Sequence, residues 1–145
     1  MTNPNLKANG TLVDGRGRLF QSTSALHISD WGKAMTEQLA DKQCVPCRGG
    51  VPPLKGKELE VFLRNVPQWT APDEHHLRRE FRFPDFQQAL DFVNRVGAVA
   101  EEQGHHPDML LSWGKVEVTL WTHKIDGLTE SDFIMAAKID RLNHP

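Results

Sequence analysis

Three histidines and two carboxylates in the C-terminal half of the chain have the residue types needed for acid–base chemistry. They are Glu101, the adjacent pair His105 and His106, His123 and Asp132. Imidazole gains and loses a proton near neutral pH, so several histidines in one cleft can supply both a proton donor and a proton acceptor. We therefore predict one catalytic site built from these five residues, with no cofactor and no bound metal ion.

The spacing around the histidine pair predicts a corner between a helix and a strand. Glu101 and His105 are four residues apart near a helix end, so the Glu101 carboxylate is predicted to orient or charge the His105 imidazole. Pro107 prevents the helix from continuing and favours an extended backbone at His106. The pair is therefore expected to be presented at the mouth of a pocket.

The other two residues reach this corner only if the chain folds back as a hairpin. His123 is predicted at the end of a strand, and Asp132 in the first turn of the following helix. Asp132 also completes the pattern T-x-x-D that begins at Thr129, which predicts a capping box with a purely structural role. From the residues alone, both roles for Asp132 stay open.

Structural interpretations exist for the remaining features too. A glutamate four residues before a histidine is often a solvated helix pair, and histidines at a helix end can simply complement the helix dipole. Trp113 and Trp121 are interpreted as packing residues. We assign no function to the histidines outside the cluster, which are His27, His75, His76 and His144.

Apolar periodicity predicts the elements that position the cluster. The predicted helices cover about 59–66, 86–104 and 129–142. Extended segments are predicted near Trp69 and over 76–83, 108–113 and 115–123. Hairpins interleaved with helices, in the order α-β-β-α-β-β-α, indicate an α+β fold with a four-stranded antiparallel sheet and helices on one face.

Apolar stripes on two helices predict how the domain packs and assembles. The stripe of the long helix is predicted to consist of Phe86, Leu90, Val93, Gly97 and Ala100. The stripe of the last helix, Met135, Ile139 and Leu142, is larger than one small core should need. Together with unpaired sheet edges, it predicts a homodimer or homotetramer.

Length and charge exclude several classes of protein. A chain of 145 residues is expected to form one domain. The net charge of −2 provides no basic surface for direct nucleic-acid binding. No apolar run is long enough to span a bilayer, and the N-terminus lacks a secretory pattern. The sequence therefore predicts a cytoplasmic protein without membrane contact.

The N-terminal part is expected to lie outside the domain. Residues 1–43 are predicted to be a poorly ordered extension, 44–53 a CxxC and Pro/Gly linker, and 54–143 the domain. Alternatively, residues 25–39 form a short helix that docks on the domain or on a partner through Trp31. The CxxC of the linker, Cys44 and Cys47, suits a metal half-site, a redox pair or incidental spacing.

The stretch EEQGHHPDMLLSWGKVEVTLWTHKIDGLTESD, residues 101–132, resembles the signature of the pterin-4a-carbinolamine dehydratases. The similarity extends over about 54–142. Members of that family are small α+β enzymes that remove water from a 4a-hydroxytetrahydropterin. The resemblance implies a small-molecule pterin substrate and a role in recycling the tetrahydrobiopterin cofactor of an aromatic amino-acid hydroxylase.

The resemblance also implies roles for the five residues of the cluster. His105 and His123 would be the catalytic pair, and His106 a pterin contact with a share in the chemistry. Glu101 and Asp132 would support them. An imidazolium would protonate the departing 4a-hydroxyl, and a neutral group would accept the proton that the ring releases as the quinonoid dihydropterin forms. The resemblance further implies a dimer through sheet edges and a tetramer through helices.

Two other functions are compatible with the sequence. Proteins of this fold also act as non-catalytic dimerisation partners and assembly factors, for a transcription factor in animals and for Rubisco in some autotrophs. A zinc module built from Cys44, Cys47 and the histidine pair is the third hypothesis, and it requires the linker to fold back onto the histidine corner. A dehydration assay and the metal content of the purified protein distinguish the three.

Overall fold

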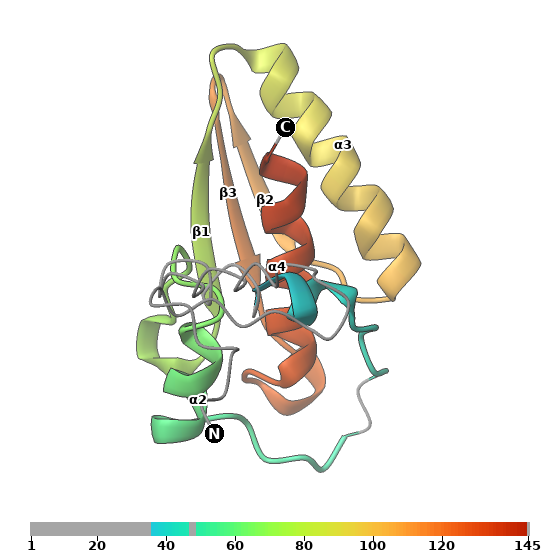
Figure 1. Cartoon of the computed structure of the whole chain (residues 1–145). Helices are drawn as coiled ribbons and strands as arrows, with labels where there is room; N and C mark the ends of the chain where they lie inside the picture. The colour runs from blue at the N-terminus through green and yellow to red at the C-terminus, as the bar shows by residue number, and fades with distance from the viewer. Residues whose placement is uncertain (1–35, 47–48, 145) are drawn as a thin grey trace, which may run out of the picture.

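The computed structural model describes residues 36–46 and 49–144, which are shown in colour in Figure 1. The elements in chain order are α2 (Gly56–Leu63), η1 (Pro72–Glu74), β1 (Leu77–Arg82), α3 (Phe86–Gln103), β2 (Asp108–Ser112), β3 (Lys115–Leu120), η2 (His123–Ile125) and α4 (Glu130–Asn143). Helical residues 36–41 precede them. No helix within the described ranges has the length and apolar character to span a membrane.

The sheet has three antiparallel strands in the order β1-β3-β2, with β3 in the centre. The prediction of four strands is therefore wrong for the described residues. The extended segment expected near Trp69 makes only an isolated bridge, between Thr70 and Arg78. Pro72 enters the η1 turn two residues later, and because proline lacks an N–H group and fixes φ, the pairing cannot propagate there.

Side chains along β3 alternate between the two faces of the sheet, and every second one packs against the helices, as predicted. Val116, Val118 and Leu120 of β3 are fully buried beneath α3 and α4, which cover one face of the sheet (Figure 1). The opposite face is polar, and there Arg78 and Glu117 form an ion pair with a 2.6 Å separation. The sheet therefore has one apolar side and one solvated side.

Arg79 is the charged exception on the apolar side of β1, and α4 supplies its partner. Its guanidinium pairs with the buried carboxylate of Asp140. The indole Nε1 of Trp69 donates to the same carboxylate at 2.8 Å. The Arg79 guanidinium also lies over the Phe81 ring, 4.3 Å from its centroid. This cluster connects β1 to the C-terminal half of α4.

The long helix α3 has the predicted ends but a different buried face. Asp85 caps its N-terminus by accepting from the Gln88 N–H at 2.8 Å. The buried residues are Ala89, Phe92, Val96 and Ala100, so the predicted stripe is correct only at Ala100 and at the partly buried Val93. The Phe92 ring lies 4.7 Å from that of Phe81 on β1, whereas Phe86 remains 45% exposed. Contact with the sheet therefore buries the face of α3 that contains Phe92.

The last helix α4 is buried on nearly all sides. Met135 and Ile139 have no exposed surface, so the prediction that their stripe is left over for assembly is wrong. Residues 36–41 cover this helix and place Leu39 and Ala40 in the core. Lys138 of α4 donates to the Ala40 carbonyl at 2.8 Å.

The predicted N-terminal extension, 1–43, lies mostly outside the described residues, as do residues 25–35 of the alternative helix, Trp31 included. Residues 36–39, the end of that alternative helix, are described and helical. The last part of the extension, 36–43, is described and packs against the domain.

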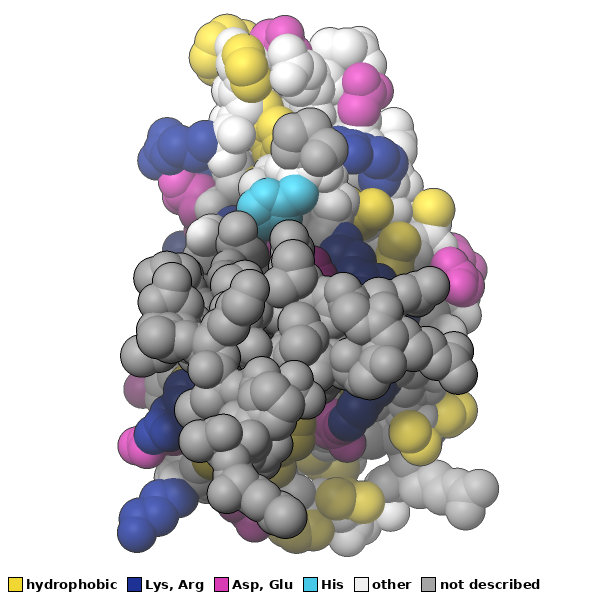
Figure 2. Space-filling model, in the orientation of Figure 1, with side chains coloured by type: hydrophobic (Ala, Val, Ile, Leu, Met, Phe, Trp, Pro, Cys, Tyr) yellow, Lys and Arg dark blue, Asp and Glu magenta, His cyan; other side chains and the backbone are white. Residues whose placement is uncertain are grey.

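The exposed apolar residues of the domain include Trp113 in the β2–β3 turn and Phe86 at the start of α3. Figure 2 shows hydrophobic side chains at the end of the molecule where this turn and the start of α3 meet.

Candidate active site

A cavity of about 300 Å³ opens where the C-terminal end of α3 meets the end of β3. All three predicted histidines line it, although they come from separate segments of the chain. The full lining consists of Cys44, Val45, Pro46, Gln103, Gly104, His105, His106, Trp121, Thr122, His123 and Lys124. The fold thus brings the histidines of the predicted cluster together in one pocket.

A left-handed glycine turns the histidine pair out of the helix. Gly104 ends α3 with φ 61°, a conformation that favours glycine because it has no Cβ atom. The N–H of the next residue, His105, donates to the Ala100 carbonyl at 3.2 Å, which closes the helix end. Pro107 then leads directly into β2. The sequence therefore fixes the corner through a glycine cap followed by a proline.

A hydrogen bond to the buried Asp132 carboxylate orients the His105 imidazole. Nε2 of His105 donates to Oδ1 of Asp132 at 2.7 Å, and the carboxylate has no exposed surface. The other oxygen, Oδ2, accepts from the Thr122 hydroxyl at 2.9 Å and from the Thr129 N–H at 2.8 Å. The predicted capping box is confirmed. Asp132 therefore caps α4 and orients a pocket histidine at the same time.

The predicted pairing of Glu101 with His105 is wrong. Oε1 of Glu101 instead lies 2.7 Å from Nε2 of His106, and both side chains are exposed. The expectation assumed that the helix continues through His105, but Gly104 ends it one residue earlier. The spacing of four residues places side chains on one face only within a continuous helix.

His123 reaches the pocket from the short η2 turn after β3. Its imidazole stacks on the Trp121 indole, with ring centroids 4.3 Å apart and an angle of 16° between the planes. Trp121 was interpreted as a packing residue, but it lines the cavity and supports a predicted catalytic ring. Stacking on the indole face fixes the plane of the His123 imidazole and leaves its ring edge, which carries both nitrogens, outside the stack.

Sequence reasoning missed the residues that complete the pocket. Thr122 is buried and shares the Asp132 carboxylate. The sequence does carry a signal for it, because Thr122 is a polar residue at the inward position that follows Leu120 in the strand alternation. Gln103 and residues 44–46 carried no comparable signal, since their place in the pocket depends on tertiary contacts.

The linker folds back onto the histidine corner, as the zinc hypothesis requires, and brings Cys44 into the cavity lining. Its Sγ donates to the Ser131 carbonyl at 3.5 Å, and burial raises the pKa of Cys44 to about 11. Cys47, the second cysteine of the zinc hypothesis, lies outside the described residues. Within 36–46 and 49–144, no group of three or more His, Cys, Asp or Glu side chains is placed to hold a metal ion.

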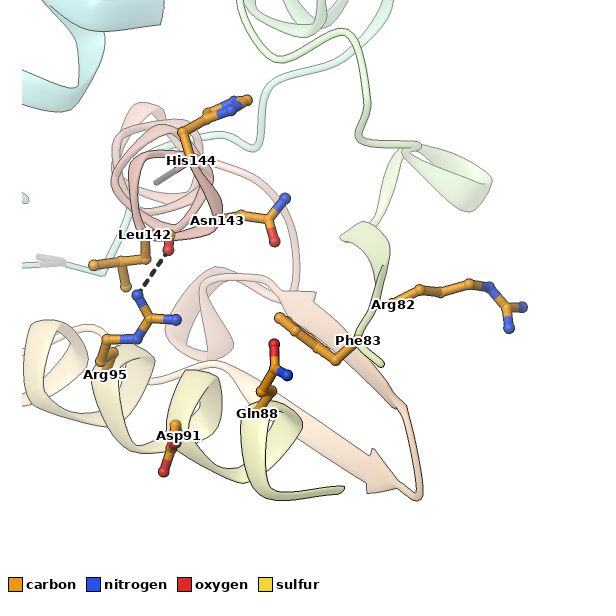
Figure 3. Close-up of a pocket in the computed structure, with 8 residues that line it drawn as sticks. All are labelled: Arg82, Phe83, Gln88, Asp91, Arg95, Leu142, Asn143 and His144. Carbon is orange, nitrogen blue, oxygen red and sulfur yellow. Dashed lines mark hydrogen bonds between the residues drawn. The ribbon is translucent and has the colours of Figure 1, made fainter. Parts of the chain in front are cut away.

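A larger cavity, of about 640 Å³, lies at the opposite end of α3, between its N-terminal half and the end of α4 (Figure 3). Arg82 points away from the other lining residues. Arg95 turns back to donate to the Leu142 carbonyl at 3.0 Å. The cavity has a single histidine, His144, and no catalytic cluster predicted from the sequence. The histidine-lined cavity is therefore the candidate active site.

Comparison with known proteins places this geometry in context. The sequence model of the family described as pterin 4 alpha carbinolamine dehydratase matches residues 52–142. A Rubrobacter xylanophilus protein, provisionally named pterin-4-alpha-carbinolamine dehydratase, is 68% identical over 105 residues, which cover 72% of this chain and 98% of the relative. A relative from Alkaliphilus metalliredigens with the same provisional name is 54% identical over 104 residues, covering 71% of this chain and 94% of that protein.

The fold also matches a solved structure. The crystal structure of a transcriptional coactivator/pterin dehydratase from Brucella melitensis aligns with a TM-score of 0.60 and 34% identity. The alignment covers 63% of this chain and 98% of that one. All five residues of the predicted cluster fall within the matched family range, whereas residues 44–46 of the cavity lie before it.

Proposed function

Because this chain belongs to the pterin-4a-carbinolamine dehydratase family, we propose that it removes water from a 4a-hydroxytetrahydropterin to form the quinonoid dihydropterin. One observation carries the proposal. His105, His106 and His123 line a single cavity, and a buried carboxylate fixes the orientation of His105. A cavity of about 300 Å³ is in the range that accommodates a small ligand.

In the proposed reaction, His105 is the general acid. The C4a–O bond breaks as the leaving hydroxyl takes a proton from the imidazolium, and the products are water and the quinonoid ring. The hydrogen bond between His105 and the Asp132 carboxylate supports this role, because a buried negative charge stabilises a positively charged imidazole.

His123 is the proposed general base, which accepts the proton that the pterin ring releases. Among the described residues, no carboxylate lies within hydrogen-bonding distance of His123. Its ring is held by the Trp121 stack instead. The two histidines therefore differ in their contacts, since one is hydrogen-bonded to a carboxylate and the other is stacked on an indole, and this difference supports different roles in one pocket. No electrons are exchanged with a second substrate.

His106 is proposed to contact the pterin and to act mainly on its binding. Its partner Glu101 is 80% exposed in its side chain, so the pair is strongly screened by solvent. This arrangement suits a binding contact at the cavity rim better than a buried acid. Glu101 then has an indirect role, through the orientation of His106.

The direct test is a dehydration assay with a freshly generated 4a-hydroxytetrahydropterin, followed by absorbance. We expect turnover above the spontaneous rate, and loss of that turnover in His105→Ala. A folded protein that leaves the spontaneous rate unchanged would refute the proposal. In that case the binding role suggested by the name of the Brucella melitensis relative, transcriptional coactivator, becomes the second candidate.

We also propose that the protein forms a homodimer or homotetramer through the β2 edge of the sheet. Among the described residues, no strand pairs with the outer side of β2. Leu110 on this strand is 59% exposed, and Trp113 in the adjoining turn is 71% exposed. An unpaired strand bearing apolar side chains is a template for pairing with a second copy.

A further inference from the structure

We propose that residues 43–46, here called the strap, form a wall of the pterin cavity, and that Val45 contacts the bound pterin. Gln103 and Ser131 are the positioning residues that hold the strap in place. The inference builds on the proposed function and adds a determinant of pterin binding. The strap precedes the range of 52–142 that the family model matches, although the 105-residue alignment with the Rubrobacter xylanophilus relative is long enough to extend over it.

Gln103, the last residue of α3, holds the first part of the strap with both ends of its amide. Its Oε1 accepts from the Cys44 N–H at 3.0 Å, and its Nε2 donates to Oε1 of Gln43 at 2.9 Å. Gln103 is separated from His105 only by the glycine cap. The strap is therefore attached directly to the corner that presents the histidine pair.

Ser131, in the first turn of α4, holds the second part of the strap. Its hydroxyl accepts from the Val45 N–H at 3.1 Å and donates to the Val45 carbonyl at 3.2 Å. Its own carbonyl accepts from the Cys44 thiol. Gln103 lies two residues before His105, and Ser131 lies directly before Asp132. The residues that hold the strap are thus next in the chain to those of the His105–Asp132 pair.

The strap contributes an apolar surface to a pocket that is otherwise rich in imidazole. The Val45 residue is 71% exposed although its backbone is fixed by two hydrogen bonds. Small-molecule sites combine apolar walls with a few polar groups that set orientation. Cys44 is a half-buried thiol at neutral pH, since burial raises its pKa, so it serves as a weak donor rather than as a nucleophile.

The test measures the Kd of 7,8-dihydrobiopterin, which has no 4a-hydroxyl to lose, and the KM and kcat of dehydration. Val45→Ser removes the apolar contact, and Ser131→Ala releases the second part of the strap. We expect each to raise Kd and KM by roughly fivefold to tenfold, the effect of losing one partly buried aliphatic contact or one hydrogen-bonded anchor, with kcat changed less than about twofold.

Two matched controls separate this effect from general destabilisation. Val61→Ser changes another exposed valine, 56% exposed on α2 and outside the cavity lining. Arg141→Ala releases the helical residues 36–41, because Arg141 donates to the Glu37 carbonyl and pairs with Asp41. Both controls are expected to leave Kd and KM unchanged. Ser131→Thr keeps the hydroxyl and is expected to retain most of the binding lost in Ser131→Ala.

Each outcome separates the strap from the proposed reaction. Unchanged Kd in both Val45→Ser and Ser131→Ala, with the variants folded by circular dichroism, would overturn the strap even if dehydration is rapid. Weakened binding in these variants, together with no turnover in the unchanged protein, would support the strap and refute the dehydratase. Failure of the unchanged protein to bind 7,8-dihydrobiopterin would overturn the strap, whereas only the absence of turnover would overturn the dehydratase.

Discussion

His105 and Asp132 are joined across the pocket floor by a hydrogen bond of 2.7 Å, and the same carboxylate caps the last helix through the Thr129 N–H. One buried side chain thus couples the start of α4 to the orientation of an imidazole at the end of α3. The two interpretations of Asp132 that the sequence left open are compatible, because each uses a different carboxylate oxygen.

Asp132→Asn separates the two roles. The amide oxygen can still accept from the Thr129 N–H, so we expect a loss of roughly 1 kcal/mol or less in the free energy of unfolding. The amide cannot supply the negative charge beside His105, so kcat should fall roughly tenfold to hundredfold, as for residues that orient a catalytic group. Urea denaturation and the dehydration assay measure the two quantities. Unchanged kcat would leave Asp132 with the cap alone.

Thr129→Ala is the matched control for the helix cap. It removes the capping hydroxyl and is expected to cost roughly 1 kcal/mol of stability. Because His105 keeps its carboxylate partner, kcat at a temperature well below unfolding should stay within about threefold of the unchanged protein. A kcat loss as large as that of Asp132→Asn would mean that the cap geometry, rather than the charge, controls the site.

The three pocket histidines are expected to differ in kinetic signature. His105→Ala and His123→Ala should each lower kcat by roughly two to four powers of ten, the range for losing a positioned acid or base. His106→Ala should mainly raise KM. His144→Ala, in the other cavity, is the control and should change neither constant. Near-normal turnover in folded His105→Ala and His123→Ala would exclude the acid–base assignment.

Glu101→Gln tests the corrected pairing with His106. The pair is exposed, and such ion pairs contribute roughly 1 kcal/mol or less. We therefore expect KM to rise by less than about fivefold at low salt, with kcat unchanged, and the difference to shrink as salt is added. A fall in kcat comparable to that of His105→Ala would instead indicate that Glu101 acts on His105, as the helix spacing first indicated.

The three pocket histidines come from separate segments, and their grouping in one site was predicted from the family resemblance. The capping box was predictable from the residues themselves, because it depends on a local pattern that the fold preserves. Asp85 and Gly104 likewise mark the two ends of α3 by their cap chemistry alone. Periodicity also predicted that Val116, Val118 and Leu120 face the helices. These features need only a few neighbouring residues to be specified.

The predictions that were wrong depend either on the backbone conformation of one glycine or on contacts between distant segments. Glu101 pairs with His106 because the left-handed Gly104 breaks the helical spacing, which a rule for continuous helices does not anticipate. The buried face of α3 follows the Phe81–Phe92 contact with the sheet. The apolar face of α4 is covered by residues 36–41, a segment that was expected in the extension and that only the alternative interpretation docked on the domain as part of a helix.

The buried ion pair between Arg79 and Asp140 gives a prediction about stability. Both side chains are about nine-tenths buried, and burial raises the pKa of Asp140, although Arg79 and the Trp69 indole oppose the shift. Asp140→Ala leaves the buried Arg79 charge without a countercharge, with the neutral Gln68 amide as its remaining hydrogen-bond acceptor, so we expect a loss of roughly 3–5 kcal/mol in the free energy of unfolding. Urea denaturation monitored by circular dichroism provides the measurement.

Replacing both members of the pair is expected to recover part of this loss. In Arg79→Met/Asp140→Leu no uncompensated charge remains, and only the Trp69 indole loses an acceptor, which costs roughly 1–3 kcal/mol. The double variant should therefore be more stable than Asp140→Ala. Equal stability of the two would show that the packing of Asp140, rather than charge compensation, controls this region.

Assembly through the β2 edge predicts a specific effect of charge. Leu110→Lys places a cation on the exposed edge strand, and edge charges discourage pairing between sheets. We expect light scattering at micromolar concentration to give a dimer or tetramer for the unchanged protein and a smaller mass for Leu110→Lys, with little change in its folded circular dichroism spectrum. Val61→Lys, on α2, is the control and should keep the larger mass.

Ile139→Glu is unsuitable for this test because Ile139 is fully buried, so its loss would unfold the chain. A monomeric unchanged protein, or a Leu110→Lys variant with undiminished mass, would exclude assembly through this edge.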